Sequence, residues 1–360
     1  MSDERADLEA LRDRIRELDV QLVRLLDERS QVSVEVGEFK ASAGIPVFQP
    51  SQEAEVMQRL QSLMHGPLNR HHLQSIYREI LSSSRDLQGL GPASYLGPAG
   101  SFTHQAALSL FGSSMPLQPC SSIEAVFRDV ESRRSEFGVV PVENSIEGVV
   151  AQTLDRLGTS TVSICSEVNL AIRHHLLSTV SLPEVKKVYS HPQALAQCRE
   201  WLGEHLPGVE EVEVASTAAA VQTALHEQGS AAIASEAASL LYGLNVLAKG
   251  IEGREGNITR FLLIGRQSPP PSGDDKTSVC FSLLDRAGVL HDALLPLKEE
   301  GINMSMIQSR PVRDRNWEYV FFVDMLGHKD DGPMSRALQG LQGHCARFKT
   351  LGSYPRARTP

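Results

Sequence analysis

The 360-residue sequence contains few cysteines and no long apolar segment. Its five cysteines are scattered, odd in number and without a CxxC pair, which argues against a zinc site and against a disulfide framework. No run of about 18 apolar residues is present to span a membrane. The charged start MSDERADLEA also lacks the apolar core of a signal peptide. These absences predict a reduced, cytoplasmic location without membrane association.

The sequence also lacks the positive charge of a general nucleic-acid binder, because its formal net charge is −9. Its 41% hydrophobic and 22% charged residues are ordinary for a globular protein. A chain of this length exceeds one ordinary domain, so two or three domains are expected. No internal repeat of the solenoid kind is present.

Residues 1–90 are predicted to form an all-α domain, because their apolar residues recur at helical spacing. A first helix should run to Lys40, where a glycine and a proline soon follow. Two further helices are expected over residues 51–64, with Ser51 as the cap, and over residues 68–87.

Two rows of positions seven residues apart run through the first helix, which is the pattern of a long helix packed against other helices. Three helices with so long a first member cannot bury both rows, so a dimer of intertwined helices is expected. All members but one are apolar: Leu8, Ile15, Leu22, Arg29 and Val36 in one row, and Leu11, Leu18, Leu25, Val32 and Phe39 in the other.

Arg29 is the exception in these rows, and a guanidinium there is costly unless an anionic group meets it. An internal salt bridge and an anion-binding pocket between helices are both possible explanations. Lys40 lies eleven residues further on and shares the face of Arg29, since the two differ by only about 20° in direction. Arg12 lies about 100° off that face, so it would reach the same anion only from a partner helix.

Three more polar residues could complete such a pocket. Ser84 and Gln88 are one turn apart on the third helix, and Glu53 lies near the start of the second. Such a site, without a nucleophile and base, suits a reaction that needs only confinement and an electrostatic field. The alternative is that Lys40 and Glu53 are solvated helix ends.

Residues 93–266 alternate short apolar segments with helical stretches, which predicts an α/β domain with mainly parallel strands. The span allows two lobes with a cleft between them. The expected strands are ASYLG, FGVVPV, STVSIC, KVYS, AAIAS and RFLLIG.

Four junctions next to these strands carry hydroxyl, amide or charged groups that could hold an anion at the mouth of a sheet. Ordinary helix capping is the alternative for each junction taken alone. The first junction is neither GxGxxG nor a P-loop, so a nucleotide is not favoured. The candidate residues are Ser101, Phe102, Thr103, Glu143, Asn144, Ser145, Ser216, Thr217, Asn257, Thr259 and Arg260.

Two histidine pairs, His71-His72 and His174-His175, could be read as metal ligands. Adjacent histidines point in divergent directions, so surface or packing roles are favoured and no metal site is predicted.

The last part of the chain follows the proline-rich linker RQSPPPSGDD. Residues 275–357 have the predicted element order βαββαβ, which is the ferredoxin-like α+β unit.

These segments resemble the bifunctional chorismate mutase–prephenate dehydratase family over essentially the whole chain. LRDRIRELD and VEVGEFK are similar to its helical mutase domain, and GPAGSFTHQAA, GVVPVENSIEG, YSHPQALAQC and NITRF to its dehydratase domain. DRAGVL and IQSRP resemble the phenylalanine-sensing segments of an ACT domain. The resemblance implies a periplasmic-binding-protein-like shape for the two-lobed domain and no cofactor. It also implies conversion of chorismate to prephenate and of prephenate to phenylpyruvate, with feedback inhibition by L-phenylalanine.

For the mutase, the resemblance implies that Arg29 and the partner subunit's Arg12 bind the carboxylates of chorismate. Lys40 and Gln88 would face its ether oxygen, and the remaining polar groups of the substrate would be contacted by Glu53 and Ser84. For the dehydratase, it implies catalytic roles for the motif Thr259, Arg260 and Phe261. Thr259 would sit at the leaving hydroxyl, either as a hydrogen-bond donor or as an acid. Arg260 would organise the site or bind a carboxylate.

For the regulatory domain, the resemblance implies an effector site that faces a neighbouring subunit, made by Ala287, Gly288, Val289, Leu290, Asn303, Gln308, Ser309 and Arg310. The sequence departs from the family at two positions. Gln52 stands where an arginine is usual, which removes one cation from the mutase pocket, and Gln308 stands where a glutamate is usual.

Two other functions remain as alternatives at this point. One is a monofunctional dehydratase whose helical domain serves only to dimerise. The other is a non-catalytic small-molecule sensor, and the Thr259-Arg260 dipeptide argues against it because simple binding does not need that pair.

Overall fold

The computed structural model describes residues 2–253, 256–284, 286–311 and 319–357. The chain forms two compact units. The first consists of Met1–Gln49, Met57–Gly91 and Phe111–Met115, and the second of Pro50–Val56, Pro92–Leu110 and Pro116–Pro360. None of the helices in the described ranges is long and apolar enough to cross a membrane.

Three helices account for the N-terminal segment, as predicted: α1 (Ser2–Ala43), α2 (Pro50–Ser62) and α3 (Arg70–Leu87). The expectation that Ser51 caps α2 is wrong. Gln49 occupies the N-cap position, and Pro50 opens the helix, where its missing N–H leaves no donor unsatisfied. Asn69 caps α3 by accepting a hydrogen bond from the backbone N–H of His72 at 2.9 Å.

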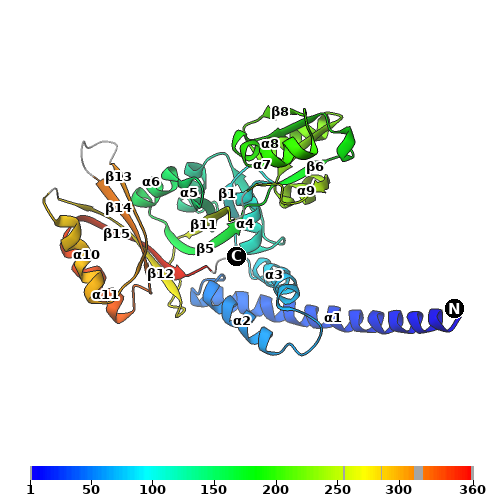
Figure 1. The fold of residues 1–360 in the computed structure, drawn as a ribbon. Helices are drawn as coiled ribbons and strands as arrows, with labels where there is room; N and C mark the ends of the chain where they lie inside the picture. Colours follow the sequence, from blue (N-terminus) through cyan, green and yellow to red (C-terminus); the bar gives the residue numbers. More distant parts are fainter. Residues whose placement is uncertain (1, 254–255, 285, 312–318, 358–360) are drawn as a thin grey trace. The chain divides into compact units, whose positions relative to one another are not determined.

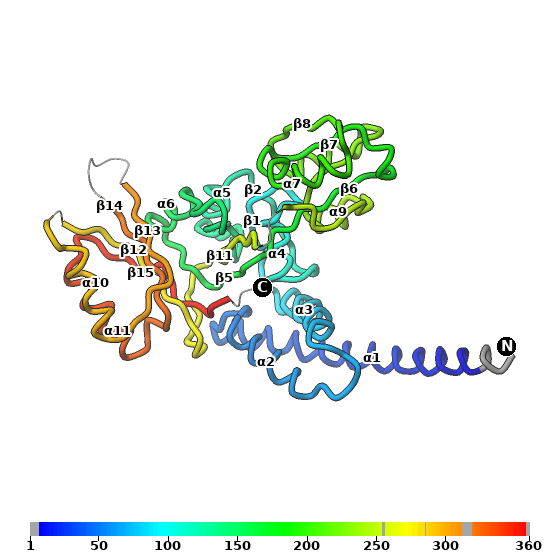
Figure 2. The backbone as a smooth tube through the Cα atoms, in the orientation of Figure 1, coloured from blue at the N-terminus to red at the C-terminus, as the bar shows by residue number. Residues whose placement is uncertain are grey.

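The two helices α1 and α3 pack closely at Gly37. A Cβ atom on Gly37 would lie 2.8 Å from the Cα atom of Gln88, so only glycine allows this approach. The N-terminal half of α1 extends beyond α3 (Figure 2). In a single chain the apolar members of both seven-residue rows are exposed, from 39% at Val36 to 66% at Phe39.

The α/β region contains two sheets, as the two-lobed prediction requires. The first has the strand order β2-β1-β3-β11-β5, with β4 paired to β3. Its strands are β1 (Ala93–Leu96), β2 (Leu117–Cys120), β3 (Phe137–Asn144), β4 (Gly148–Val149), β5 (Ser163–Ala171) and β11 (Ile258–Gly265). Its helices are α4 (Phe102–Phe111), α5 (Ile123–Glu131) and α6 (Ala151–Thr159).

The second sheet has the order β10-β6-β9-β7-β8. Its strands are β6 (His175–Ser178), β7 (Lys187–Ser190), β8 (Glu210–Glu213), β9 (Ser230–Ala234) and β10 (Asn245–Ala248). Its helices are α7 (Pro192–His205), α8 (Thr217–His226) and α9 (Glu236–Tyr242), and the short 3-10 helix η1 spans Leu182–Glu184.

The prediction of mainly parallel strands is wrong, because both sheets are mixed. Strands β1, β2 and β3 run parallel, whereas β11 is antiparallel to both β3 and β5. In the second sheet β7 is parallel to β8 and β9, whereas β6 is antiparallel to β9 and β10. Strand β6 is the first strand after the chain crosses from the first lobe to the second, and β11 is the first strand after it crosses back. The direction of these two strands follows from the crossings between the lobes.

The C-terminal region confirms the βαββαβ prediction. Its sheet has the all-antiparallel order β13-β14-β12-β15. The elements are β12 (Asp275–Leu283), α10 (Val289–Glu299), β13 (Met304–Pro311), β14 (Tyr319–Leu326), α11 (Gly332–Gly343) and β15 (Cys345–Pro355). The predicted start of the third strand, at Trp317 and Glu318, lies outside the described residues.

This C-terminal sheet is covered on both faces (Figure 1). Val279 and Val323 pack against α10 and α11 on one face. Cys280 and Phe322 on the other face join a core cluster with residues of β3, α5, α6 and β11. The backbone of β15 approaches β5 so closely that a Cβ atom on Gly352 would lie 2.3 Å from the carbonyl oxygen of Ile164. The domain therefore shares a hydrophobic core with the first lobe, although a proline-rich segment connects them.

Candidate active sites

The predicted mutase residues Arg29 and Ser84 are in contact within the helical unit. Nη1 of Arg29 donates a short hydrogen bond to Oγ of Ser84, and this hydroxyl donates to the carbonyl oxygen of Ile80 at 2.8 Å. No carboxylate in the described part of the chain pairs with Arg29, so the internal salt bridge is not found. The guanidinium therefore has donors left for an anionic ligand.

Gln88 and Lys40 lie on the same side of α1 as Gly37. The Oε1 atom of Gln88 is buried and has no hydrogen-bond partner among the described residues. Lys40 follows Gly37 by one turn, and its Nζ donates to the carbonyl oxygen of Val47 at 2.9 Å. A buried polar atom without a partner is costly, so the amide of Gln88 is suited to meeting a polar ligand.

The other two predicted mutase residues are Arg12 and Glu53. Arg12 lies on an exposed stretch of α1 and pairs with Glu9 at 3.3 Å. It is about 25 Å along the same helix from Arg29, so it cannot reach that site within one chain. Glu53 lies in the first turn of α2, within the segment assigned to the second unit, so its place in the pocket stays a prediction.

The predicted dehydratase residues meet where β3 ends and β11 begins. Because these strands are antiparallel, Thr259 pairs in register with Asn144, and Arg260 pairs with Glu143. The start of β11 is thereby brought to the carboxyl end of β3, where ligands of α/β sheets bind. Thr259 is 8% exposed and Asn257 is 5% exposed.

Asn144 holds the hydroxyl of Thr259 in a defined orientation. Oδ1 of Asn144 accepts the backbone N–H groups of Ile146 at 2.9 Å and Glu147 at 3.0 Å. Its Nδ2 donates to Oδ1 of Asn257 and to Oγ1 of Thr259, both at 2.8 Å. Thr259 is the acceptor in this bond, and no described residue accepts its hydroxyl proton. That proton is therefore free to be donated to a ligand.

Two residues that were not predicted continue this chain of hydrogen bonds. Nδ2 of Asn257 donates to Oε1 of Gln197 at 3.1 Å, and Nε2 of His174 lies 3.1 Å from the same oxygen. Burial lowers the pKa of His174, which keeps the ring neutral. Its Nδ1 atom is then an acceptor, and it has no partner among the described residues. Gln197 lies in the motif YSHPQALAQC, in the helix that follows strand β7. Its place on that helix, close after the end of a strand, could have indicated it as a site residue.

The remaining junction residues have mixed roles. Ser101 and Ser216 act as helix caps, accepting from the N–H groups of His104 at 3.2 Å and Ala219 at 3.0 Å. Ser145 bonds backbone groups of the segment before β11, which braces that segment. Phe102 packs edge-on against His174 with ring centres 5.5 Å apart. Thr103 is buried and Thr217 opens α8, and no described contact joins either one to Thr259.

Arg260 points away from the hydroxyl of Thr259, and Phe261 is buried. Phe261 is 2% exposed and belongs to the protein core. The guanidinium of Arg260 donates to Glu167, Asp324 and Tyr354. Protein groups thereby accept from all three of its nitrogen atoms, which favours the organising role over the binding of a substrate carboxylate.

The predicted effector residues divide between two faces of the C-terminal sheet. Gly288 caps α10 on the helix-covered face, with a left-handed φ of 76°, and Ala287 and Asn303 are exposed in one chain. Arg310 lies on the opposite face and forms two hydrogen bonds with Asp155 of α6, at 2.8 and 3.2 Å. Arg310 therefore joins the C-terminal domain to the first lobe.

One sizeable cavity lies apart from the residues around Thr259. It has a volume of about 580 Å³ and lies between α6 and the C-terminal sheet. Phe322, Phe348, Asp155 and Arg310 are among its lining residues. The hydrogen-bonded cluster at Thr259, with its free donor and its orphaned acceptor, has more of the chemistry of an active site than this mainly apolar cavity.

These features together define a multidomain enzyme: a helical unit with a cationic pocket, a two-lobed α/β region with a polar site at a strand end, and a ferredoxin-like domain. Three family models match in that order: chorismate mutase type II over residues 11–89, prephenate dehydratase over 93–269, and ACT domain over 277–343. The chain belongs to the bifunctional chorismate mutase/prephenate dehydratase family.

Individual relatives support this assignment. A bifunctional chorismate mutase/prephenate dehydratase from Aquifex aeolicus is 44% identical, over 98% of each chain. The structure of a prephenate dehydratase from Arthrobacter aurescens in complex with L-Phe is 35% identical, with a TM-score of 0.68 over 74% of this chain and 90% of that one. A structure described as GqqA, a novel type of quorum quenching acylase, is 27% identical, with a TM-score of 0.68 over 73% and 96%.

Proposed function

We propose that this chain rearranges chorismate to prephenate in its helical domain and converts prephenate to phenylpyruvate in its α/β domain. The domains occupy residues 1–90, 93–266 and 275–357, and the last one is the regulatory ACT domain. The bifunctional relatives match nearly the full length of the chain, helical region included. This match favours the bifunctional enzyme over a monofunctional dehydratase, a non-catalytic sensor or an acylase. We place the enzyme in the cytoplasm, where this biosynthesis needs no secretion.

The mutase reaction needs a pocket that holds a dianion in a compact conformation. Arg29 has donors to spare, and Lys40 and Gln88 lie on the same side of α1. As the ether C–O bond of chorismate breaks, negative charge grows on its oxygen, and Lys40 and Gln88 stabilise that charge. Glu53 and Ser84 contact the other polar groups of the substrate. The protein supplies orientation and field, and no covalent intermediate is needed.

The partner subunit's Arg12 would complete this pocket, so we propose that the chain forms a homodimer or a higher homo-oligomer. The exposed apolar rows on α1 support the dimer, because they leave a long apolar stripe uncovered in one chain. A second copy of α1 would bury that stripe, and the partner subunit's Arg12 would then approach Arg29 of this chain.

The dehydratase reaction removes carbon dioxide and hydroxide from prephenate. The electrons of the bond to the departing carboxylate move into the ring, and the ring hydroxyl leaves as the ring becomes aromatic. The observation that carries this assignment is the orientation of Thr259, whose oxygen accepts from Asn144 and whose proton is free. Thr259 uses that proton to donate a hydrogen bond to the leaving oxygen, which stabilises the negative charge of the departing hydroxide. We keep Asn257, Glu143 and residues 101–103, 145 and 216–217 as candidate substrate contacts.

Separate steady-state assays of the full chain with chorismate and with prephenate test this proposal. Turnover of both substrates is expected. Turnover of prephenate alone would support the monofunctional dehydratase, and turnover of neither would support the sensor. The product of each assay is identified by its ultraviolet spectrum, because phenylpyruvate and prephenate differ in conjugation.

We further propose that L-phenylalanine inhibits the dehydratase from the ACT domain. Its amino and carboxyl groups meet the backbone at residues 287–290 and Asn303, with Gln308 and Ser309 nearby. Ala287 and Asn303 are exposed in one chain, which leaves them available to an effector shared with a second subunit. Gln308→Glu, the family's usual residue, is expected to change the phenylalanine concentration that gives half-inhibition, measured with prephenate, while turnover without phenylalanine stays the same.

A further inference from the structure

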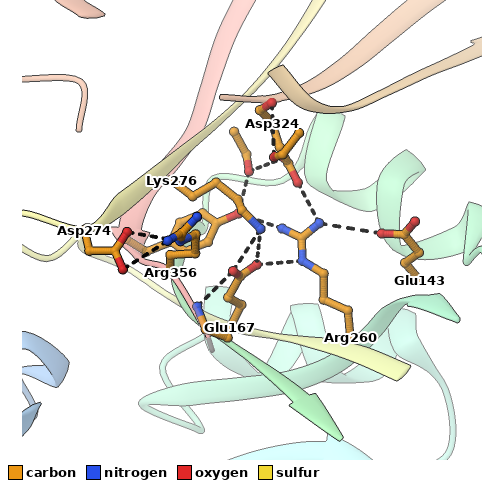
Figure 3. Close-up of polar contacts among 11 residues, drawn as sticks. Glu143, Glu167, Arg260, Asp274, Lys276, Asp324 and Arg356 are labelled. Atoms are coloured by element: carbon orange, nitrogen blue, oxygen red, sulfur yellow. Dashed lines mark hydrogen bonds and ion pairs between the residues drawn. The ribbon is translucent and has the colours of Figure 1, made fainter. Parts of the chain in front are cut away.

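A buried polar network connects the ACT domain to the strand that carries Thr259 (Figure 3). We call it the interdomain network, and its members are Glu167 of β5, Arg260 of β11, Lys276 and Ser278 of β12, Asp324 of β14 and Tyr354 of β15. Four of the six residues belong to the ACT domain. They are separated from Arg260 by up to 94 positions in sequence.

Arg260 is the centre of this network. Its Nε atom donates to Glu167 at 2.6 Å, its Nη1 atom to Asp324 at 2.6 Å, and its Nη2 atom to the hydroxyl of Tyr354 at 3.0 Å. A fourth group, the carboxylate of Glu143, lies 3.8 Å from Nη1. The planar guanidinium is thus held from three directions, so a shift of the ACT strands moves Arg260 with them.

The other members hold the partners of Arg260 in place. Nζ of Lys276 lies 2.9 and 3.0 Å from the two carboxylate oxygens of Glu167. Oγ of Ser278 donates to Asp324 at 2.5 Å and lies 2.6 Å from the hydroxyl of Tyr354. Burial raises the pKa of Tyr354, so the phenol keeps its proton and donates it to Ser278.

The network is electrically balanced and almost dry. It contains two cations, Arg260 and Lys276, and two carboxylates, Glu167 and Asp324. Glu167 is 5% exposed, Asp324 is 2% exposed and Tyr354 is fully buried. Removing one partner from such a buried network leaves an uncompensated charge, so its geometry is strongly defined.

Thr259 and Arg260 are neighbours on one strand and therefore point to opposite faces of the sheet. The hydroxyl of Thr259 faces Asn144, and the guanidinium faces the ACT domain. The pairing of β11 with β3 shifts register between Arg260 and Phe261, directly after this pair. Such bulges re-aim neighbouring side chains, and here the backbone between two fixed side chains sets where the hydroxyl lies.

We propose that Asp324 and Tyr354 of the ACT domain are positioning residues for the dehydratase, and that the effector state of this domain reaches Thr259 through Arg260. The proposal rests on the dehydratase function proposed above. When the ACT sheet shifts, the network carries the shift to β11 and displaces the hydroxyl from the leaving oxygen. A displacement of about 1 Å at a reacting group can lower a rate by about 10²-fold.

The test uses Tyr354→Phe and Asp324→Asn in the full chain, since both replacements keep the size of the side chain. The dehydratase kcat is expected to fall by about 10-fold or more with KM changed little, because positioning acts on the transition state. Chorismate turnover should stay at the wild-type level. Calorimetry should show that phenylalanine still binds, while its affinity no longer depends on prephenate, because the coupling between the sites is reciprocal.

A matched control is available at the second ion pair between the same domains. Asp155→Asn removes the ion pair with Arg310 and one of its two hydrogen-bond acceptors, and Asp155 lies on α6 and not on β11. The kcat for prephenate should stay within about twofold of wild type. If Tyr354→Phe and Asp324→Asn fold and keep both their kcat and their coupling, the inference is overturned. A fall in kcat of the same size in Asp155→Asn would also overturn it, because general loosening of the interface would then explain the effect. If the wild-type chain itself does not turn over prephenate, the dehydratase function fails first, and the inference fails with it.

Discussion

The helical unit and the second unit, called here the dehydratase–ACT unit, differ in how much of each proposed active site one chain supplies. In one chain the helical unit leaves two apolar rows of α1 exposed and keeps Arg12 about 25 Å from Arg29. The dehydratase–ACT unit instead shares one hydrophobic core between its domains and joins them by ion pairs. On the proposed functions, we therefore expect a second copy of the chain to complete the first site, and the second site to be complete and supported within one chain.

The two arginines of these sites show the same contrast. Arg29 donates to Ser84 and has donors left over, so it is available to a substrate carboxylate. Arg260 is engaged at Nε, Nη1 and Nη2. Burial opposes its charged form, but the neighbouring carboxylates of Asp324 and Glu167 help to raise its pKa. A guanidinium held by one protein group is more available to a ligand than one held by three, which instead helps to fix the backbone that carries it. Sequence position next to an active residue does not distinguish these roles.

Replacing Arg29 gives the largest expected effect. Arg29→Ala removes the guanidinium that is proposed to bind a carboxylate of chorismate, and it should abolish chorismate turnover to the limit of detection. Turnover of prephenate should be unchanged, because Thr259 lies in the other unit. Both assays are run on the same folded preparation. Equal loss of the two activities would contradict the separation of the sites.

Replacing Thr259 gives the next largest effect. Thr259→Ala should lower kcat for prephenate by about 10² or more, as expected when a positioned proton donor is lost. Chorismate turnover serves as the internal control and should not change. Thr259→Ser keeps the hydroxyl and should recover part of the rate. A variant with normal kcat and raised KM would instead make Thr259 a binding residue.

Adding a cation to the mutase pocket is expected to have a moderate effect. Gln52 stands beside Glu53 in the first turn of α2, where the family usually has an arginine. Gln52→Arg should raise kcat/KM for chorismate several-fold by strengthening the field on the dianion. Gln58→Arg adds the same charge elsewhere on α2 and should have little effect. An increase of equal size in both variants would point to long-range attraction, which added salt would remove.

The smallest expected effect concerns pH and the stability of the second unit. Burial lowers the pKa of His174 and His175 below the ordinary value of 6.5. Above pH 6.5 both rings are neutral in the folded and in the unfolded chain, so they do not change the free energy of unfolding with pH. Below pH 6.5 the unfolded chain takes up protons on these rings that the folded chain does not. The free energy of unfolding should therefore fall as pH drops below 6.5, by at most about 1.4 kcal/mol per pH unit per ring.

Urea titrations across this pH range measure the effect. His174→Gln should reduce the slope of unfolding free energy against pH. His191→Gln is a suitable control, since that ring is the partly exposed cap of α7. An unchanged slope in His174→Gln would show that His174 takes up its proton equally in both states.

Local patterns predicted much of this fold. The seven-residue rows defined α1 and singled out Arg29, and the βαββαβ order emerged from alternating apolar runs near the C-terminus. Strand direction was not predictable in the same way, because β11 and β6 run antiparallel owing to where the chain crosses between lobes. The cap of α2 was misjudged because Pro50 can open a helix without a capping side chain.

The partners of Arg260 were hidden for a different reason. Asp324 and Tyr354 read as ordinary strand residues, and only the packing of the ACT sheet on the first lobe brings them to β11. Gly352 permits that packing, yet a single glycine in a strand carries no signal about its neighbour. Contacts between residues so distant in sequence depend on the tertiary arrangement and not on local propensity.

The contrast between a shared site and a self-contained one is tested most directly by mixing inactive variants. Arg12→Ala and Arg29→Ala are each expected to be inactive toward chorismate, but heterodimers formed by refolding them together would have one site with both arginines. An equal mixture should recover about one quarter of wild-type mutase activity, since about half of the dimers are mixed and each has one intact site. Asn144→Ala and Thr259→Ala, mixed in the same way, should recover no dehydratase activity beyond that of the separate variants. Absence of mutase recovery in verified heterodimers, or recovery of dehydratase activity, would contradict this account.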